Sequence, residues 1–300
     1  MSNAYRRPRV VAEIGCNHRG SMTVAKELVK LARDCGVEYV KFQKRTVREL
    51  LTPEQYDAPH PNPHHAYGTT YGAHREFLEF DAGQHRELKE YCRDLGVEYS
   101  CSVWDVTAAR QIIELGPNLI KIPSARNHSL ELLRTVRDEF DGIVQVSLGM
   151  TTRDEERAVL EVFEETGAAA QRLTLYACTS GYPVAFEDVC LLEIERLRNA
   201  YRNRVRAIGF SGHHLGIAVD IAAYTLGAEW IERHFTADRT WKGTDHAASL
   251  EATGLRKLVR DLQATHAALT HKREELLPIE AEQRAKLKTH DTAQPRVVTS

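Results

Sequence analysis

The sequence lacks the features that would assign it to several special classes of protein. Its six cysteines are scattered and contain no CxxC pair, so reduced thiols are expected. No apolar run approaches the roughly 20 residues that cross a bilayer, and the start MSNAYRRPRV is polar and basic, unlike a secretory signal. A net charge of −2 gives no global field to recruit nucleic acid or an anionic membrane. We therefore expect a cytoplasmic protein that binds any anion through a local cluster.

Short apolar runs alternate with amphipathic helical stretches along nearly the whole chain. After the first run, for example, Val24, Leu28 and Leu31 recur at helical spacing. Eight apolar runs are each followed by such a stretch; they span residues 10–15, 39–44, 98–103, 119–125, 143–149, 172–180, 207–213 and 230–236. Strict alternation implies parallel strands, and eight units favour closure into a (β/α)₈ TIM barrel. A doubly wound open sheet is the alternative, disfavoured because no GxGxxG follows the first run.

Two segments depart from this alternation. Residues 45–80 form a long insertion after the second strand, rich in His, Pro, Tyr and Gly, and loops of that length are typically lids or disordered spans. From residue 272 the chain is charged, which is typical of a frayed tail. We expect one barrel domain over 1–271 and a C-terminal tail over 272–300.

Polar residues stand at the carboxyl end of every predicted strand, where a barrel of this class places its catalytic groups. They are Glu13, Lys41, Gln43, Ser102, Lys121, Ser124, Ser147, Thr179, Tyr182, Ser211, His213 and His234. Capping of the next helix explains any single polar strand end. Polar ends on all eight strands, two of them lysines, indicate a site.

Lys41 and Lys121 each stand inside an otherwise apolar strand. A buried ammonium must find an anion or lose its charge. Surrounded by hydroxyls, two lysines indicate a phosphate or carboxylate pocket. The alternative is a pair of internal salt bridges to Glu13 or Glu232.

His213 and His234 end neighbouring strands, so their imidazoles are expected at the same mouth. Two histidines with open positions filled by water suit a borderline ion such as Mn²⁺, Fe²⁺ or Zn²⁺. The neighbouring His214 points the other way and is expected to be structural.

Seven motifs in this order resemble those of the N-acetylneuraminate (sialic acid) synthase family over residues 9–252. They are AEIGCNHRGS, VKFQ, KIPSA, VSLGM, ACTSGYPVAFEDV, GFSGHHLGIAVDIAAYTLGAEWIERHFTADR and GTDHAASLE. The resemblance implies a TIM-barrel transferase that condenses phosphoenolpyruvate with an acylamino sugar in its open-chain aldehyde form. The implied products are a 2-keto-3-deoxy sugar acid and phosphate.

The resemblance also implies metal ligands and a phosphoenolpyruvate pocket. His213 and His234 correspond to the ligands of a divalent metal, typically Mn²⁺, with Mg²⁺, Co²⁺ or Fe²⁺ as alternatives. The positions that correspond to the phosphoenolpyruvate pocket are Lys41, Ser102, Lys121, Ser124, Ser147, Ser180 and Ser211. Ser102 stands where the family usually has threonine, and Ser180 replaces an asparagine.

Four further residues correspond to groups around the metal and the sugar: Glu13, Gln43, Tyr182 and Asp245. Glu13 is the candidate for handling the proton of the attacking water or steadying positive charge at C2. A salt bridge to a pocket lysine is its alternative role.

The sequence departs from the family pattern in three places. It ends at residue 300, where the family usually continues into an antifreeze-like domain, so a variant lacking that domain is expected. Arg126 replaces a glutamate that contacts the sugar, and Gly212 replaces an aspartate. Arg126 therefore predicts a different acceptor, anionic or hydroxyl-rich, or it substitutes for the missing domain's arginine. Tyr71 and Arg75 of the 45–80 insertion are expected to cover the acceptor.

Two other functions remain open at this stage. One is a pyruvate aldolase that uses Lys121 as a Schiff base on the same barrel. The other is a non-catalytic barrel that binds a sugar. The expected partners are phosphoenolpyruvate and a sugar aldehyde, with no nucleic acid or membrane, and a homodimer through the barrel is a further expectation.

Overall fold

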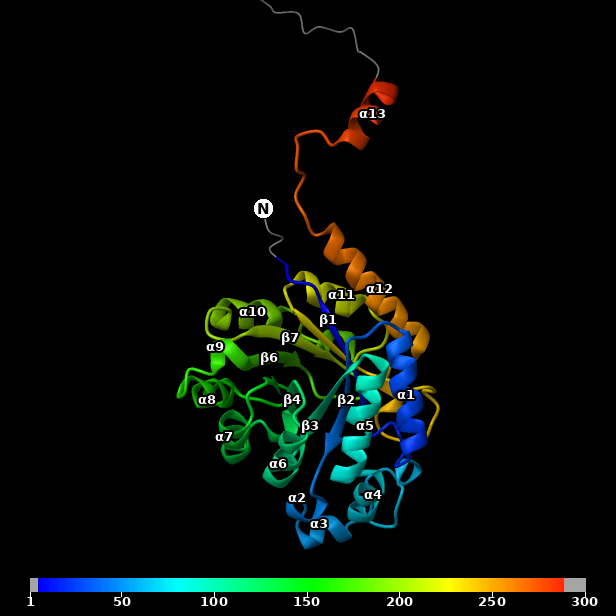
Figure 1. Ribbon diagram of the computed structural model, residues 1–300, viewed down its shortest axis with the longest axis vertical. Coiled ribbons are helices and arrows are strands. Elements are labelled where there is room, and N and C mark those ends of the chain that lie inside the picture. Colours follow the sequence, from blue (N-terminus) through cyan, green and yellow to red (C-terminus); the bar gives the residue numbers. More distant parts are fainter. Residues whose placement is uncertain (1–4, 289–300) are drawn as a thin grey trace, which may run out of the picture.

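The chain folds into a closed barrel of eight parallel strands, each hydrogen-bonded to the next, with β8 returning to β1 (Figure 1). This computed structural model describes residues 5–288; residues 1–4 and 289–300, the latter part of the predicted tail, lie outside the described residues. The strands are β1 Arg9–Gly15, β2 Tyr39–Lys44, β3 Glu98–Val103, β4 Leu119–Ile122, β5 Ile143–Ser147, β6 Leu173–Cys178, β7 Ala207–Gly212 and β8 Trp230–His234. The predicted (β/α)₈ barrel is confirmed. Several strands end one to three residues before the predicted runs, because the polar residues there already belong to loops.

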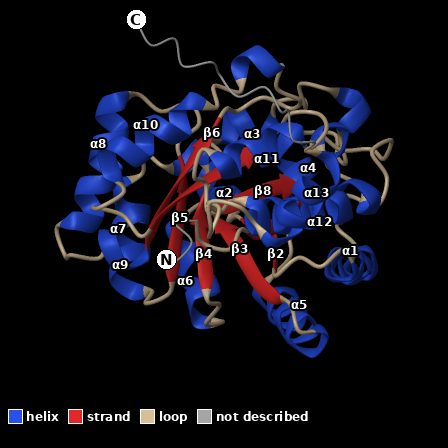
Figure 2. Ribbon diagram, turned by 90° about the horizontal axis from the view of Figure 1, so that it is seen from above, coloured by secondary structure: helices blue, strands red, loops and turns tan. Residues whose placement is uncertain are grey.

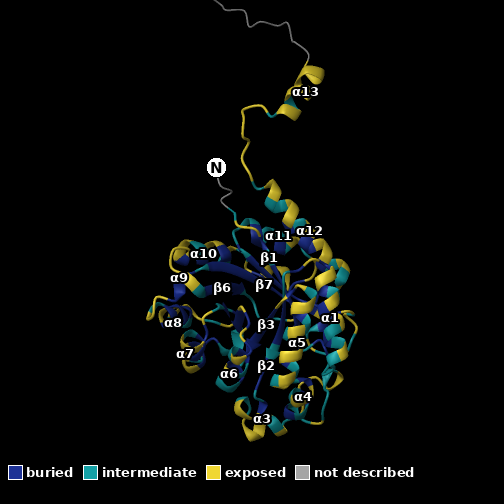
Figure 3. Ribbon diagram, in the orientation of Figure 1, coloured by how far each residue is buried: buried dark blue, intermediate teal, exposed yellow. Residues whose placement is uncertain are grey.

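Helices surround the strands on the outside of the barrel (Figure 2). Those that follow successive strands are α1 Met22–Asp34, α5 Ala82–Leu95, α6 Val106–Glu114, α7 Leu130–Glu139, α8 Arg153–Glu164, α10 Leu192–Tyr201, α11 Ala218–Thr225 and α12 Ala252–Ala268, with a short α9 Ala169–Arg172 before β6. Their apolar stripes face the barrel: α1, for instance, buries Ala25, Leu28, Val29 and Ala32. In Figure 3 the strands are therefore buried while the outer helix faces are exposed.

The interior of the barrel is layered along its axis. Toward the amino ends of the strands it is filled by an apolar cluster that includes Val11, Leu119, Tyr176 and Trp230. Toward the carboxyl ends, the residues two positions further along the same strands are polar, as with Glu13 after Val11 and Lys121 after Leu119. Side chains alternate between the two faces of a strand, so the same inward face supplies both layers. The apolar layer closes the barrel at the amino ends of the strands, and the polar layer opens to solvent at their carboxyl ends.

The 45–80 insertion consists of short helices: α2 Val47–Leu50, α3 Pro53–Asp57, η1 Pro63–His65 and α4 Tyr71–Leu78. They lie beyond the carboxyl ends of the strands, at the bottom of Figure 1. The segment contacts the loop after β8, since the Tyr67 hydroxyl donates to the Lys242 carbonyl. The Gly243 amide also donates to Nδ1 of His65, at 3.2 Å. The insertion therefore borders the catalytic end of the barrel.

Beyond α12, helix α13 (Pro278–Leu287) stands apart from the barrel and buries none of its residues (Figures 1 and 3). None of the helices in residues 5–288 is long and apolar enough to cross a membrane. All six cysteines are free thiols.

Candidate active site

A cavity of about 410 Å³ opens at the carboxyl ends of the strands. Most of the residues predicted from the sequence line it: Glu13, Lys41, Gln43, Arg75, Ser102, Lys121, Ser124, Ser147, Ser180, Tyr182, Ser211, His213, His234 and Asp245. Two predicted acceptor residues, Tyr71 and Arg126, lie outside it in a neighbouring pocket. Sequence reasoning did not select Arg45, Trp104 or Cys178, which also line the cavity.

Two lysines and two glutamates form a buried network at the floor of this cavity. Lys41 Nζ lies 2.5 Å from Glu13 Oε2 and 3.8 Å from Glu232 Oε1, and Lys121 Nζ lies 2.6 Å from the same Glu232 oxygen. Neither lysine is more than 2% exposed. The alternative of internal salt bridges is therefore what the structure contains, and the same lysines line the cavity. The two interpretations are compatible.

Glu232 joins the two lysines and is the main residue that sequence reasoning underrated. It was weighed only as a salt-bridge partner, although its position two residues before His234 on one strand places both side chains on the inward face. Attraction by Lys121 and Lys41 outweighs burial and holds the pKa of Glu232 at about 2. Glu232 is therefore a fixed negative charge between two ammonium groups.

The other three groups of the network titrate differently. Burial raises the pKa of Glu13 above its ordinary value despite the attraction of Lys41. Burial lowers the pKa of Lys121, an effect that Glu232 only partly offsets. For Lys41, attraction to both glutamates outweighs burial and raises the pKa. The two carboxylates balance the two ammonium groups, so a bound anion must draw the lysines away from their carboxylates.

Hydroxyl groups surround this network. Lys41 Nζ donates to Ser102 Oγ at 2.6 Å, and Ser211 Oγ donates to Glu232 Oε1 at 3.1 Å. Ser124 Oγ accepts from the Gly149 amide at 3.1 Å. A side chain at Gly149 would collide with Ser180 Oγ, so glycine is needed there for the hydroxyls to approach the backbone. The cavity thus offers several small donors to an oxyanion.

The two predicted metal ligands lie together at one side of the cavity. The ring centroids of His213 and His234 are 5.4 Å apart, and Tyr182 packs against both rings. His213 Nδ1 lies 2.9 Å from the Thr179 carbonyl oxygen, which fixes Nδ1 as the donor and leaves the lone pair on Nε2.

His234 carries an unpaired nitrogen. Its Nδ1 is buried without a hydrogen-bond partner and lies 3.9 Å from Asp245 Oδ2. Burial lowers the pKa of His234 to about 3, so the ring is neutral. Within residues 5–288, no group of three or more His, Cys, Asp or Glu side chains is arranged as a metal site. Interactions with Cys178 and the Thr179 carbonyl outweigh burial and raise the pKa of His213. When His213 is also deprotonated, the two imidazoles fit a divalent ion whose other ligands are water or substrate oxygens.

His214 belongs to a separate buried cluster on the outside of the barrel wall. Arg233 Nη1 lies 3.0 Å from His214 Nε2 and 2.5 Å from Asp220 Oδ2. Arg233 also donates to the backbone carbonyls of His214 and Gly216, at 2.5 and 2.8 Å. A Cβ at Gly212 would lie 2.8 Å from the His214 ring, so the glycine in place of the family's aspartate makes room for this ring.

Arg126 and Tyr71 line a second pocket of about 200 Å³ that shares Arg45, Arg75 and Trp104 with the main cavity. Tyr71 orients Arg75 by accepting from its Nε and Nη2 at 3.0 and 2.9 Å. Arg126 Nε is buried with no hydrogen-bond partner. Arg126 is displaced from the main cavity because the chain turns into a 3₁₀ helix, η2 (Ser124–Arg126), directly after β4.

Comparison with known proteins identifies the family of this chain. A model of the NeuB family matches residues 28–274. The chain is 35% identical to N-acetylneuraminate-9-phosphate synthase from Homo sapiens, over 90% of this chain and 74% of that protein. It is 32% identical to N,N'-diacetyllegionaminic acid synthase from Campylobacter jejuni, over 87% of this chain and 77% of that protein.

Solved structures lead to the same family. The N-acetylneuraminic acid synthetase of Leptospira borgpetersenii, crystallised in complex with citrate, matches with a TM-score of 0.79 at 27% identity, over 94% of this chain and 93% of that chain. A truncated 3-deoxy-D-arabino-heptulosonate 7-phosphate synthase from Thermotoga maritima shares the fold, with a TM-score of 0.64 at 15% identity over 89% of this chain and 88% of that chain. The chain belongs to the NeuB family of synthases, which condense phosphoenolpyruvate with a sugar.

Proposed function

We propose that the protein condenses phosphoenolpyruvate with the open-chain aldehyde of an acylamino sugar, giving a 2-keto-3-deoxy sugar acid and phosphate. One observation carries the proposal: Lys41 and Lys121 line the same 410 Å³ cavity as His213 and His234. A binding site for an anion and two imidazoles thus share one cavity.

Phosphoenolpyruvate supplies a phosphate and a carboxylate, and the floor of the cavity supplies matching donors. Lys41 and Lys121 exchange their glutamate partners for substrate oxygens, and the hydroxyls of Ser102, Ser124 and Ser211 donate to the same oxygens. Carbon C3 of the enol forms a bond to the aldehyde carbon, whose oxygen takes up a proton. Water adds at C2, and phosphate leaves by cleavage of the C2–O bond.

Glu13 is the residue that we propose takes the proton of the attacking water. Its carboxylate lies between Lys41 and Gln43, whose Nε2 donates to Glu13 Oε1 at 2.7 Å. A carboxylate that is fixed by two neighbours and lines the cavity can accept a proton at a defined position. Its negative charge also offsets positive charge that develops at C2.

His213 and His234 are the residues that would hold a divalent metal, and Mn²⁺ is the ion we propose. The family is generally dependent on a divalent metal, which agrees with the unpartnered Nδ1 of His234. A bound divalent ion polarises the aldehyde oxygen as a Lewis acid. Asp245, 3.9 Å from His234 Nδ1, is placed to accept hydrogen bonds from water or sugar hydroxyls beside it.

The acceptor is proposed to carry an anionic group that reaches the second pocket. Arg126 and Arg75 line that pocket, and a buried Arg126 Nε without a partner favours a ligand oxygen there. The human relative is named for a phosphorylated product, which is the kind of group that paired guanidinium forks bind. A sugar phosphate is therefore the acceptor to test first.

A Schiff-base aldolase is not favoured. The relatives are named as synthases, and Lys121 Nζ is engaged by Glu232 at 2.6 Å and lies 4.3 Å from the centroid of the Tyr176 ring. Borohydride treatment in the presence of pyruvate is expected to leave the chain unlabelled. Covalent labelling of Lys121 would overturn the proposed chemistry.

Phosphate release from phosphoenolpyruvate tests the function directly. The acceptors are acylated hexosamines and their 6-phosphates, each assayed with protein stripped by EDTA and again after addition of Mn²⁺. We expect release only with acceptor and restored metal. A panel in which no acceptor stimulates release would contradict the proposal.

The variant Arg126→Ala tests the second pocket separately. We expect the KM for the acceptor to rise at least tenfold, about 1.4 kcal/mol, with the KM for phosphoenolpyruvate unchanged. The exposed Arg202 gives a matched control, Arg202→Ala. An unchanged acceptor KM would exclude Arg126 from acceptor binding.

A further inference from the structure

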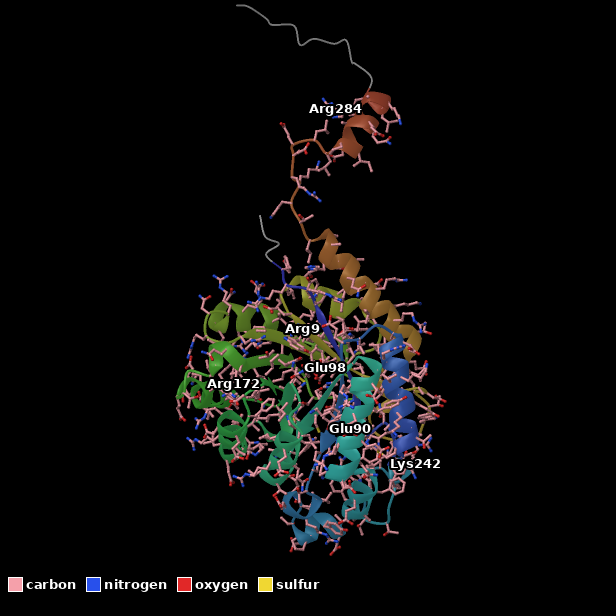
Figure 4. The ribbon with its side chains drawn as sticks, in the orientation of Figure 1. Arg9, Glu90, Glu98, Arg172, Lys242 and Arg284 are labelled. Carbon is pink, nitrogen blue, oxygen red and sulfur yellow. The ribbon has the colours of Figure 1, made fainter. Side chains whose placement is uncertain are left out.

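A second charged cavity, of about 250 Å³, lies at the opposite, amino-terminal end of the barrel and has no part in the proposed reaction. It is formed where the starts of β1, β7 and β8 meet the residue before β2. Six charged residues line it: Arg6, Arg7, Arg9, Arg206, Glu38 and Glu229. In Figure 4, Arg9 lies in the upper part of the barrel, away from the insertion helices at the bottom that border the catalytic mouth.

Two of these arginines are held in place without being neutralised. The Arg9 guanidinium lies 4.8 Å from the centroid of the Trp230 ring, which is only 2% exposed and therefore forms a fixed platform. Arg206 Nη1 donates to the Gln171 carbonyl at 2.9 Å. Within residues 5–288, neither Arg9 nor Arg206 has a carboxylate within 4.0 Å. Both are thus oriented in advance, which lowers the entropic cost of binding an anion.

The other two arginines form the outer rim and are weakly held. Arg6 pairs with Glu229 and Arg7 pairs with Glu38, both at 3.3 Å, and the two arginine side chains are 70% and 67% exposed. Exposed ion pairs of this kind contribute little to stability, because water screens them. Arg6 and Arg7 can therefore exchange a carboxylate for a ligand oxygen at little cost.

The charge of the cavity matches a dianion. Its two glutamates offset two of its four arginines, which leaves two positive charges unbalanced. A larger groove of about 600 Å³ between α5 and α6 provides a contrast, because its three basic residues face three glutamates, including Glu90 and Glu98, labelled in Figure 4. That groove has no net charge to select an anion. The smaller cavity does.

We infer that the cavity at the amino-terminal end binds the phosphate of a small phosphate monoester, at a site separate from the catalytic cavity. A phosphate monoester carries close to two negative charges at neutral pH and has three terminal acceptor oxygens. It can therefore bind several guanidinium groups at once, which a single carboxylate does less well. Arg9 and Trp230 stand four residues before Glu13 and His234 on β1 and β8. At about 3.3 Å per residue the two sites are about 13 Å apart. The inference does not depend on the proposed reaction.

Trp230 supplies a built-in reporter for the test. Replacing the other two tryptophans, by Trp104→Phe and Trp241→Phe, leaves Trp230 as the single fluorophore. Titration of this protein with glycerol 3-phosphate is expected to give a saturable change in emission with a Kd below about 1 mM. The absence of a saturable change would overturn the inference.

Variants decide which end of the barrel binds the probe. Arg206→Gln, and the double variant Arg9→Gln/Arg206→Gln, are expected to raise the Kd at least tenfold. Arg202→Gln/Arg256→Gln removes two charges from exposed arginines outside the cavity and is expected to leave it unchanged. Loss of binding in Lys41→Gln/Lys121→Gln instead, with no loss in Arg206→Gln, would assign the signal to the catalytic cavity and overturn the inference. Arg206→Gln leaves the Arg9–Trp230 packing intact, so its result stands if the double variant does not fold.

Discussion

Two clusters of buried charge lie on opposite sides of one strand, β8, and differ in what holds them. Glu232 points into the barrel and pairs with Lys121 and Lys41. Arg233, the next residue, points outward and pairs with Asp220. Lys41 and Lys121 contact the side chains of Glu13, Ser102 and Glu232. Arg233 also donates to the backbone carbonyls of His214 and Gly216.

The kind of hydrogen-bond partner, side chain or backbone, distinguishes the inner cluster, which can bind a ligand, from the outer cluster, which holds a loop in place. Partners that are all side chains can rearrange when an anion enters, so the inner cluster can exchange glutamates for substrate. Backbone carbonyls cannot move without moving the loop after β7, so the outer cluster fixes that loop. Both clusters are expensive to break by removing one partner, because a charge is then left buried alone. Only the inner cluster faces the cavity.

Breaking the inner cluster is expected to have the largest effect on activity. In Lys121→Met, kcat/KM for phosphoenolpyruvate should fall at least about 1000-fold, roughly 4 kcal/mol, because the substrate phosphate loses a cation and Glu232 repels it. Phosphate release measures the loss, and Lys257→Met on the exposed face of α12 is the control. A fall of less than tenfold would contradict a role for Lys121 in binding.

A double variant separates stability from activity in the same cluster. Lys121→Met/Glu232→Gln removes the unpaired charge, so urea denaturation should show most of the lost stability restored. Activity should stay low, since the cation is still missing. Recovery of both would mean that the network is only structural.

Breaking the outer cluster should affect stability instead. Arg233→Met leaves the buried Asp220 without its arginine and with only His214 Nε2, at 3.3 Å, beside it, and the free energy of unfolding should fall by about 3–5 kcal/mol. The protein that remains folded at low temperature should keep kcat/KM within tenfold. Asp220→Asn added to Arg233→Met should recover part of the stability. A fall in kcat/KM as large as that of Lys121→Met would erase the distinction between the two clusters.

The inner site was more predictable from sequence than the outer one, for a physical reason. Alternation of strands and helices fixes the barrel, and the barrel places every strand end at one mouth, so Lys41 and His213 could be brought together without coordinates. That Arg126 lines the neighbouring pocket and not the main cavity was not predictable, because the turn after β4 depends on packing that no periodicity encodes. The helices of the insertion are too short to give a helical pattern. The cavity at the amino-terminal end is lined by residues near 6–9, 38, 206 and 229. These residues come together only when the barrel closes with β8 paired to β1 in the observed register.

A substitution at Gly212, which packs against the His214 ring, is expected to have an effect of intermediate size on stability. A methyl at Gly212 would meet the His214 ring and the Phe210 ring, each at 2.8 Å. Gly212→Ala should therefore destabilise the protein by about 1–3 kcal/mol, the usual cost of overpacking. In His214→Ala the contact with the imidazole is removed and only the contact with Phe210 remains, so the two substitutions should be partly non-additive in a double-mutant cycle. Additive effects would show that His214 does not set the need for glycine.

The smallest expected effect compares two buried groups: Glu232, which its lysine partners hold ionised, and His18, which stays neutral. Glu232 has a pKa of about 2 because the lysines hold it ionised, so its contribution to stability is present above pH 4.5 and is lost only below that. Burial, helped by the neighbouring His85 and Arg45, lowers the pKa of His18 to about 3. Below pH 6.5 the unfolded chain gains a proton at this histidine while the folded chain does not, so stability falls as the pH falls.

The window between pH 6.5 and 4.5 therefore reports on neutral buried histidines and not on Glu232. His18→Gln should reduce the dependence of the unfolding free energy on pH by up to about 1.4 kcal/mol per pH unit in this window. Urea denaturation at several pH values measures it, and His271→Gln, at an exposed histidine, is the control. Because all other titrating groups are common to both proteins, the difference between the two slopes isolates His18. An equal slope in His18→Gln and wild type would mean that the ring is protonated in the folded state, and that its stacking on Phe80, at 4.0 Å, is a charged contact.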